Sequence, residues 1–334
     1  MELPIRHGRP ALVLAPMEGV TDAPMRALLT ELPGFTHCVT EFLRISQMAL
    51  PAKCYPRHAG ELNHDSRTAA GVPVIFQLLG GNAERLALSA KYACEAGAQS
   101  IDLNFGCPAP TVNNHDGGAA ILRCPERVEE IVRAVREAVP AHLPVSAKLR
   151  LGWDDPNAIF ENARRAERGG ASWITIHGRT KTQGYRPPAY WEPIAEVARQ
   201  ISIPVIANGE IWDLDDFKRC RDITRGEHFM IGRGALANPH LAAQIAGELG
   251  IPTSAAVSPF PTEPEWRALL QRFVEISEPL SNNPNYCLRR VKQWMRYVDS
   301  KKPFEDFQEL KRMERIEDFT AALPRLRFPE LLPA

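Results

Sequence analysis

A cysteine, a lysine and a histidine in the middle of the 334-residue chain have side chains that could take part in a reaction. Cys107 lies between a glycine and a proline, and a free thiol with a reference pKa of about 8.5 could donate a proton at neutral pH. Nearby cations would instead favour a thiolate nucleophile. Lys148 lies in an apolar run, where an ammonium group is costly to bury alone. It could form an ion pair with Asp102 or Glu210, stabilise charge on a bound cofactor, or form a Schiff base. His177 could serve the same site or only complete the hydrogen bonding of a strand end.

Eight short apolar runs separated by helical stretches occupy the first 250 residues and must position these side chains. The runs are rich in Val, Ile and Leu without strict alternation, which is typical of parallel strands buried on both faces. Their number and spacing predict an α/β fold of the (β/α)8 TIM-barrel type. A doubly wound sheet is the alternative, but no G-x-G-x-x-G motif follows the first run. The predicted strands cover residues 11–15, 37–40, 72–78, 100–104, 145–149, 173–177, 204–207 and 228–231.

The helical stretches carry their own start and stop signals. Pro125 stands near the start of one helix, and Asp213 is suited to cap another. The second unit departs from this pattern, because residues 41–71 show poor periodicity. The predicted helices of the barrel cover residues 83–96, 125–139, 157–168 and 213–221.

The last quarter of the chain has a different organisation. Residues 251–262 hold several prolines among small polar residues, which is a linker composition. Helical patterns follow at 265–278, 286–298 and 306–323. We therefore expect a barrel domain over 1–250, a linker over 251–262, and a small all-helical domain over 263–334.

Polar side chains and glycines follow nearly every predicted strand. In a (β/α)8 barrel these positions meet at one end, where the active sites of such enzymes lie. Glycines after the seventh and eighth strands allow backbone N–H groups to approach an anion closely, and barrels often bind phosphate there. Arg233 could add a charged hydrogen bond. The strand ends predict a phosphate-binding loop, although tight turns alone would also use these glycines.

The composition is that of an ordinary folded enzyme. Forty Lys and Arg balance forty Asp and Glu, which excludes a protein whose whole surface is committed to nucleic acid but allows one local basic face. No apolar run is long enough to span a membrane, and the N-terminus has no apolar signal region, so we expect a cytoplasmic protein. The seven cysteines are scattered without a C-x-x-C pair, which predicts free thiols and no metal site.

One segment is strongly basic. Residues 286–302 carry six Lys and Arg against one Asp, a balance of +5 (6 − 1), with Trp294 and Tyr297 between them. Spacings near three and four residues would place several of the cations along one helix. The segment could bind RNA phosphates, or it could be a solvated helix face whose tryptophan points into the core.

Six motifs in order resemble the flavin-dependent tRNA-dihydrouridine synthases over nearly the whole chain. Within that family the chain is most similar to the bacterial C type, through the sequences Glu-Phe-Leu-Arg at 41–44, Ala-Val-Pro-Ala-His-Leu-Pro at 138–144 and Arg-Val-Lys-Gln-Trp at 290–294. The six motifs are Ala-Pro-Met-x-Gly-Val-Thr-Asp at 15–22, Asp-Leu-Asn-x-Gly-Cys-Pro at 102–108, Val-Ser-Ala-Lys-Leu-Arg at 145–150, His-Gly-Arg-Thr-x-x-Gln-Gly-Tyr at 177–185, Pro-Val-Ile-Ala-Asn-Gly-Glu at 204–210 and Met-Ile-Gly-Arg-Gly at 230–234.

The resemblance implies a cofactor and a reaction. Members of the family bind FMN at the barrel mouth, use NADPH to reduce it, and deliver hydride to C6 of a uracil in tRNA. By this resemblance Cys107 protonates C5, and Lys148 stabilises the negative charge of the reduced flavin. The implied FMN contacts are Pro16, Met17, Glu18, Gln77, Lys148, His177, Asn208, Gly209, Glu210, Gly232 and Arg233.

The resemblance also implies the substrate. The C type acts on uridine 16 in the D-loop of tRNA, and a stacked base must be turned out to reach such a site. We expect a monomer that binds tRNA without a protein partner. The implied tRNA contacts are Arg44, Asn104, Arg150, Arg179, Tyr185, Arg289, Arg290, Lys292, Trp294 and Arg296.

Three alternatives remain open at this point. A small-molecule FMN enzyme resembling the dihydroorotate dehydrogenases would keep the flavin residues without needing the basic helix. A Schiff-base aldolase would use Lys148 and bind no flavin. A tRNA-binding protein without catalysis would have no use for Cys107.

Overall fold

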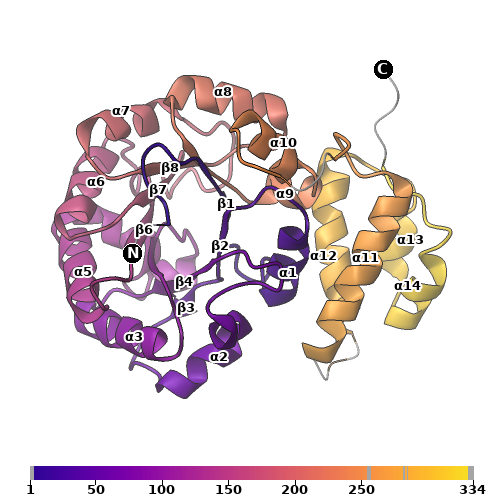
Figure 1. Ribbon diagram of the computed structural model, residues 1–334, viewed down its shortest axis with the longest axis horizontal. Coiled ribbons are helices and arrows are strands. Elements are labelled where there is room, and N and C mark those ends of the chain that lie inside the picture. The colour runs from indigo at the N-terminus through magenta and orange to yellow at the C-terminus, as the bar shows by residue number, and fades with distance from the viewer. Residues whose placement is uncertain (1–3, 254–256, 281–282, 284, 330–334) are drawn as a thin grey trace.

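The structure, a computed structural model, describes residues 4–253, 257–280, 283 and 285–329. In this part of the chain eight parallel strands close into a barrel, in the order β2-β1-β9-β8-β7-β6-β5-β4, and the pairing of β2 with β4 completes the ring (Figure 1). The predicted TIM barrel is confirmed. The strands are β1 (Ala11–Leu14), β2 (His37–Val39), β4 (Val74–Leu79), β5 (Ile101–Phe105), β6 (Val145–Arg150), β7 (Ile174–His177), β8 (Val205–Asn208) and β9 (His228–Ile231).

The barrel strands are almost completely buried because they face side chains on both sides. Inside the ring, Ile75, Trp173 and Ile206 belong to one buried cluster, which also holds Ile5 from the segment before β1. Outside the ring, a larger apolar cluster joins the strands to the surrounding helices. This double burial explains the apolar runs without alternation that the sequence shows.

A ring of helices covers the barrel (Figure 1). The four helices predicted for this region are confirmed as α3, α5, α6 and α8. Asn82 caps α3 through a 2.9 Å hydrogen bond from Arg85 N, and Asp213 caps α8 through a 2.8 Å bond from Asp216 N. The helices of this layer are α1 (Ala23–Glu31), α3 (Ala83–Glu95), α5 (Pro125–Ala138), α6 (Ala158–Arg168), α7 (Glu192–Gln200), α8 (Leu214–Thr224) and α10 (Leu241–Glu248).

The second βα unit lacks a long helix. After β2 the chain adds the short strand β3 (Leu43–Arg44) beside the end of β4, and then passes through three short helical turns. These turns are η1 (Ala52–Cys54), α2 (Tyr55–His58) and η2 (Gly60–His64). The poor periodicity of residues 41–71 therefore reflects a real interruption of the barrel pattern.

The C-terminal part is helical, and it lies to one side of the barrel in Figure 1. Helices α11 (Glu263–Ser277) and α12 (Tyr286–Lys301) match the prediction, but the single helix predicted over 306–323 is wrong. Two helices, α13 (Phe307–Arg312) and α14 (Ile316–Ala322), take its place. Lys292 Nζ donates to the main-chain oxygens of Lys311 and Met313, and these contacts satisfy the carbonyl end of α13 where the helix stops.

Helix α12 is tied to the barrel by two buried side chains. The guanidinium of Arg290 forms an ion pair with Asp22 at 2.9 Å and donates to the carbonyl oxygens of Gly19 and Val20. Trp294 is 1% exposed, and its Nε1 donates to Leu236 O at 2.9 Å. The prediction that Arg290 and Trp294 contact tRNA is wrong, because their side chains are buried between α12 and the barrel.

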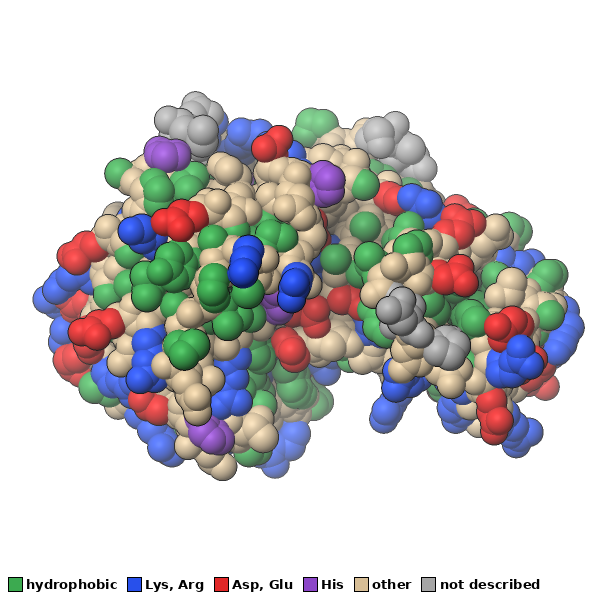
Figure 2. Space-filling view, turned by 90° about the horizontal axis from the view of Figure 1, so that it is seen from below, with side chains coloured by type: hydrophobic (Ala, Val, Ile, Leu, Met, Phe, Trp, Pro, Cys, Tyr) green, Lys and Arg blue, Asp and Glu red, His purple; other side chains and the backbone are tan. Residues whose placement is uncertain are grey.

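Positive and negative side chains are mixed on the face of the molecule that Figure 2 shows. Figure 2 shows the two parts as lobes with a hollow between them, and Lys and Arg are interspersed with Asp and Glu on both lobes of this face. No helix among the described residues is long and apolar enough to cross a membrane.

Candidate active site

A cavity of about 1350 Å³ opens at the carboxyl ends of the barrel strands. Its walls come from the loops after β1, β5, β7, β8 and β9, and α12 contributes Gln293, Arg296 and Tyr297. Every predicted cofactor residue except Gln77 lines this cavity. Of the predicted tRNA contacts, the cavity includes Arg44, Asn104, Arg150, Tyr185 and Arg296.

Cys107 is held at the cavity wall by its main chain. Asn104 Oδ1 accepts hydrogen bonds from Gly106 N and Cys107 N, both at 2.9 Å. Asn113 Nδ2 donates to Cys107 O at 3.1 Å, and Arg150 Nε donates to Gly106 O at 2.8 Å. Burial raises the pKa of the Cys107 thiol, so the group keeps its proton at neutral pH. A neutral, positioned thiol is suited to act as a general acid.

Gln77 supports this loop from below and does not line the cavity. Its side chain is 0% exposed, its Nε2 donates to Asp102 Oδ2 at 2.7 Å, and its Oε1 accepts from Asn104 Nδ2 at 2.9 Å. Ser146 completes the network through a 2.6 Å hydrogen bond to Asp102 Oδ1. Gln77, which was predicted as a flavin contact, therefore lies behind the cavity wall in this structure, where it orients Asn104.

Lys148 projects from β6 toward β8 and has no carboxylate partner among the described residues. Its Nζ donates to Asn208 Oδ1 at 3.0 Å, and Asn208 Nδ2 in turn donates to Met230 O at 2.8 Å. Burial, with a contribution from nearby Arg150, lowers the pKa of Lys148 to about 8. The ion pairs considered from the sequence are not formed. An anionic ligand in the cavity would favour the charged ammonium.

His177 presents an unsatisfied polar atom. Its Nδ1 is buried and has no hydrogen-bond partner, which is uncommon for a buried polar group. Burial and the nearby Arg150 hold the pKa of this imidazole well below its usual range, so the ring is neutral. A Cβ at Gly209, whose φ is +112°, would lie 3.2 Å from His177 Nε2, so a glycine keeps the ring accessible. This end of β7 fits a polar ligand.

The loop after β9 offers a second polar wall. Gly232 precedes the short helix α9 (Arg233–Ala237), and a Cβ there would lie 3.1 Å from Met17 Sδ. The guanidinium of Arg233 lies over the rings of Trp212, at 4.6 Å, and Tyr185, at 5.1 Å. The aromatic pair fixes a cation beside a glycine backbone, which suits a phosphate group. Trp212 was not predicted, although its place shortly after β8 is a signal that could have found it.

Two further arginines have structural contacts. Arg179 is fully buried in an ion pair with Glu210, so the prediction that it contacts tRNA is wrong. Arg150 lines the cavity, but its Nη1 donates to Thr180 O and Gly184 O at 2.9 and 2.8 Å. Arg150 therefore connects the Cys107 loop to the loop that carries Tyr185, and its predicted contact with tRNA stays a prediction.

Two of the predicted tRNA contacts, Arg44 and Arg296, stand on the rim of the cavity, whereas Arg289 does not line it. Arg44, Arg289 and Arg296 are exposed, whereas Lys292 is partly buried and bonded to α13. The direct tRNA contact predicted for Lys292 would compete with these hydrogen bonds. Glu18 lies on the same rim, where burial and the neighbouring Glu41 raise its pKa to about 7.

Relatives identified by sequence cover nearly the whole chain. A tRNA-dihydrouridine(16) synthase from Pseudomonas putida is 44% identical over 94% of this chain and 95% of its own length. Its counterpart from Aquipseudomonas alcaligenes is 42% identical over 94% and 99%. The one from Escherichia coli O157:H7 is 43% identical over 90% and 91%.

Two solved structures share the barrel fold at low sequence identity. A 2-naphthoyl-CoA reductase complex matches with a TM-score of 0.55 and 11% identity, over 71% of this chain and 50% of its own. An old yellow enzyme homologue from Zymomonas mobilis matches with a TM-score of 0.50 and 12% identity, over 74% and 90%. The sequence model described as "Dihydrouridine synthase (Dus)" matches residues 13–326, and with the relatives above it shows that the chain belongs to the dihydrouridine synthase family.

Proposed function

We propose that this protein reduces a uridine of tRNA, at position 16 in the D-loop, to 5,6-dihydrouridine with NADPH as the reductant. The observation that carries the proposal is the Cys107 thiol, which is neutral and held by Asn104 at the wall of a cavity large enough for a cofactor and a base. The relatives named tRNA-dihydrouridine(16) synthase support the choice of substrate and position.

FMN fits the residues of this cavity. His177 Nδ1 lacks a partner, Lys148 lacks a carboxylate, and Gly209 and Gly232 leave room where a Cβ would stand. Lys148 and His177 would hold the ring, with Met17 beside them, and the glycine loops with Arg233 would hold the phosphate. When bound, FMN supplies the hydride that C6 of the uracil receives.

Cys107 supplies the second hydrogen. Its Sγ–H gives a proton to C5 of the uracil while C6 takes the hydride, so the C5=C6 double bond becomes a single bond and the thiolate is left behind. Water then reprotonates the thiolate. Arg150, which holds the Gly106 carbonyl, and Asn104, which holds the Cys107 amide, keep the thiol in place through this cycle.

The substrate base must leave its stack to enter the cavity, which costs a few kcal/mol. Tyr185 is 58% exposed at the mouth and offers an aromatic face for stacking. We expect Arg44 and Arg296 at the mouth, with the exposed Arg289 of the same helix α12, to contact phosphates of the tRNA. We assign catalysis to residues 1–250 and tRNA binding to residues 263–334 together with this rim, joined by the linker 251–262.

We further propose that the protein acts as a monomer, without a protein partner, in the cytoplasm. The participation of α12 in the cavity favours an RNA substrate over a small molecule such as dihydroorotate. The basic helix α12 borders the cavity, and a small substrate would not need a basic helix there.

Mapping of dihydrouridine in tRNA from cells that lack this protein tests the proposal. We expect loss of dihydrouridine at position 16, restored by the wild-type chain and not by Cys107→Ala. Unchanged position 16 together with loss elsewhere would overturn the assigned position. Unchanged tRNA throughout would overturn the proposed substrate.

A further inference from the structure

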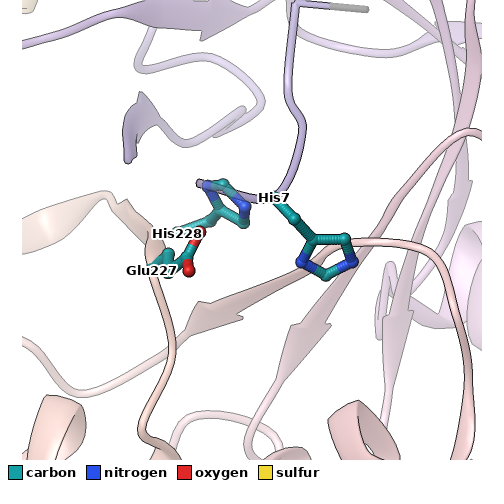
Figure 3. A group of neighbouring side chains, drawn as sticks. All are labelled: His7, Glu227 and His228. Atoms are coloured by element: carbon teal, nitrogen blue, oxygen red, sulfur yellow. The ribbon is translucent and has the colours of Figure 1, made fainter. Parts of the chain in front are cut away.

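Two histidines and a glutamate converge at the end of the barrel opposite the cavity (Figure 3). His7 belongs to the segment before β1, and Glu227 and His228 stand at the start of β9. One ring nitrogen of each histidine and one carboxylate oxygen all lie within 4.8 Å of one another. None of the three residues belongs to the catalytic cavity.

His228 has polar atoms that the protein itself does not satisfy. Its side chain is 2% exposed, and neither ring nitrogen has a hydrogen-bond partner. Buried polar groups in folded proteins are almost always hydrogen-bonded, so such a ring calls for a ligand.

The other two residues are already oriented by hydrogen bonds. His7 Nε2 lies 3.0 Å from Ser202 O, which leaves Nδ1 as the nitrogen that turns toward Glu227 and His228 in Figure 3. Gly8 N donates to Glu227 Oε2 at 2.7 Å. The loop that carries Ser202 is itself fixed, because Ser202 N and Oγ both donate to Glu167 Oε1, at 2.7 and 2.6 Å.

This pattern is the one that supports metal ligands in proteins. A metal-bound histidine usually donates its second ring N–H to a carbonyl or carboxylate, and a ligating carboxylate is hydrogen-bonded in turn. Two imidazoles and one carboxylate form a common zinc ligand set, with water in the fourth position. Mg²⁺ and Ca²⁺ prefer oxygen ligands and suit this set poorly.

We propose that His7, Glu227 and His228 bind a divalent transition-metal ion, with Zn²⁺ as the best-fitting one. Ligand atoms about 2.1 Å from a tetrahedral zinc lie about 3.4 Å apart, so the ligand atoms, which all lie within 4.8 Å of one another, must approach by at most about 1.4 Å. His7 and Glu227 are exposed at the surface and have room to make this adjustment.

The bound ion would fasten the N-terminal segment across the bottom of the barrel. Ile5, two residues before His7, is fully buried in the cluster inside the ring. A metal bridge from His7 to β9 would hold this residue in place. The role is structural, because the site lies at the end of the barrel that does not carry the active site.

Zinc titration of the full-length chain, purified without an affinity tag and treated with a chelator, tests the proposal. A chromogenic chelator competes for ZnCl₂, and the same titration is repeated with His7→Gln and Glu227→Gln, which change exposed side chains. His142→Gln, at another exposed histidine, is the matched control. We expect one zinc ion per chain, a loss of at least about tenfold in affinity for each site variant, and no change for the control.

Two results would overturn the proposal. One is the absence of zinc binding by the wild-type chain. The other is equal zinc affinity of the wild-type chain and both site variants, which would indicate that free thiols elsewhere in the chain bind the ion. A thermal unfolding midpoint that rises with ZnCl₂ in the wild-type chain and not in His7→Gln would add independent support, since a ligand stabilises only the state that binds it.

Discussion

The two ends of the barrel use the same eight strands in different ways. At the mouth, Lys148 and His177 face a large cavity with polar atoms that no protein group fully satisfies. Inside the ring, Ile5 packs with Trp173 and Ile75 in a continuous apolar cluster. Buried polar atoms without partners destabilise a folded chain, so the mouth suits a ligand, whereas the apolar cluster inside the ring stabilises the fold. Substitutions at the two ends should therefore change different measurements.

The largest effect is expected at the mouth. Cys107→Ala should reduce turnover by about 10²–10⁴-fold, because the proton for C5 loses its donor. Bound flavin and tRNA affinity should stay unchanged, since the loop is held through the main chain of residue 107. Single-turnover assays with purified tRNA would measure the loss. Cys124→Ala, at a cysteine away from the cavity, is the control, and equal rates for the two variants would remove Cys107 from the reaction.

A substitution inside the ring should lower the free energy of unfolding by an amount comparable with the change in activation free energy at the mouth. It should leave the catalytic rate unchanged. Ile5→Ala removes a fully buried side chain and should lower the free energy of unfolding by about 2–5 kcal/mol. Urea unfolding would measure this change. The turnover of the folded variant at low temperature should match that of the wild type. A variant of full stability would show that the N-terminal segment does not close the barrel.

The buried ammonium group of Lys148 should lower the stability of the flavin-free protein. Its pKa falls from 10.5 unfolded to about 8 folded, so the folded state binds fewer protons between these values and stability rises with pH across that window. Lys148→Met should therefore stabilise the flavin-free chain by about 1–3 kcal/mol at pH 7. The gain should shrink as pH increases from 8 to 10.5. Unfolding midpoints that show the same difference at every pH would contradict this account.

The smallest effect is expected at the exposed arginines of α12. Arg289→Ala with Arg296→Ala should weaken tRNA binding and make its salt dependence shallower by about 0.7–0.9 per lost phosphate contact. Filter binding over a range of salt concentrations would measure the slope. Arg290→Ala is the contrasting variant, because it breaks a buried ion pair with Asp22 and should lower stability instead. An unaltered salt dependence in the double variant would indicate that tRNA does not contact these two arginines.

The positions of the proposed catalytic and cofactor residues could be predicted from the sequence, because the strands of a barrel follow a simple geometric rule. Parallel strands place their carboxyl ends together, so the residues after each apolar run must meet at one mouth. Cys107, Lys148, His177 and Arg233 all lie there. Gln77 lies behind this mouth, because Asp102 and Asn104 use its amide, and its position near the end of a strand does not show this arrangement.

The roles of the basic residues could not be predicted in the same way. Periodicity shows that α12 is amphipathic, but it does not show what covers each face. Arg290 and Arg296 look equivalent in the sequence, yet one is buried against Asp22 and the other is exposed at the cavity rim. Arg179 was likewise misread, because nothing in its local sequence indicates the buried ion pair with Glu210.

The barrel and the set of residues at its mouth could be derived from the amino-acid sequence alone, because both depend on local hydrophobic runs and on the residues directly after each run. The exposure of each cation, and the polar atoms that are left without partners, became apparent only from the packing of the whole chain. This packing also brought His7 to Glu227 and His228, a meeting that no spacing along the chain could indicate. The physical reason is that burial and long-range pairing depend on what packs against a residue, and a single segment does not contain its own neighbours.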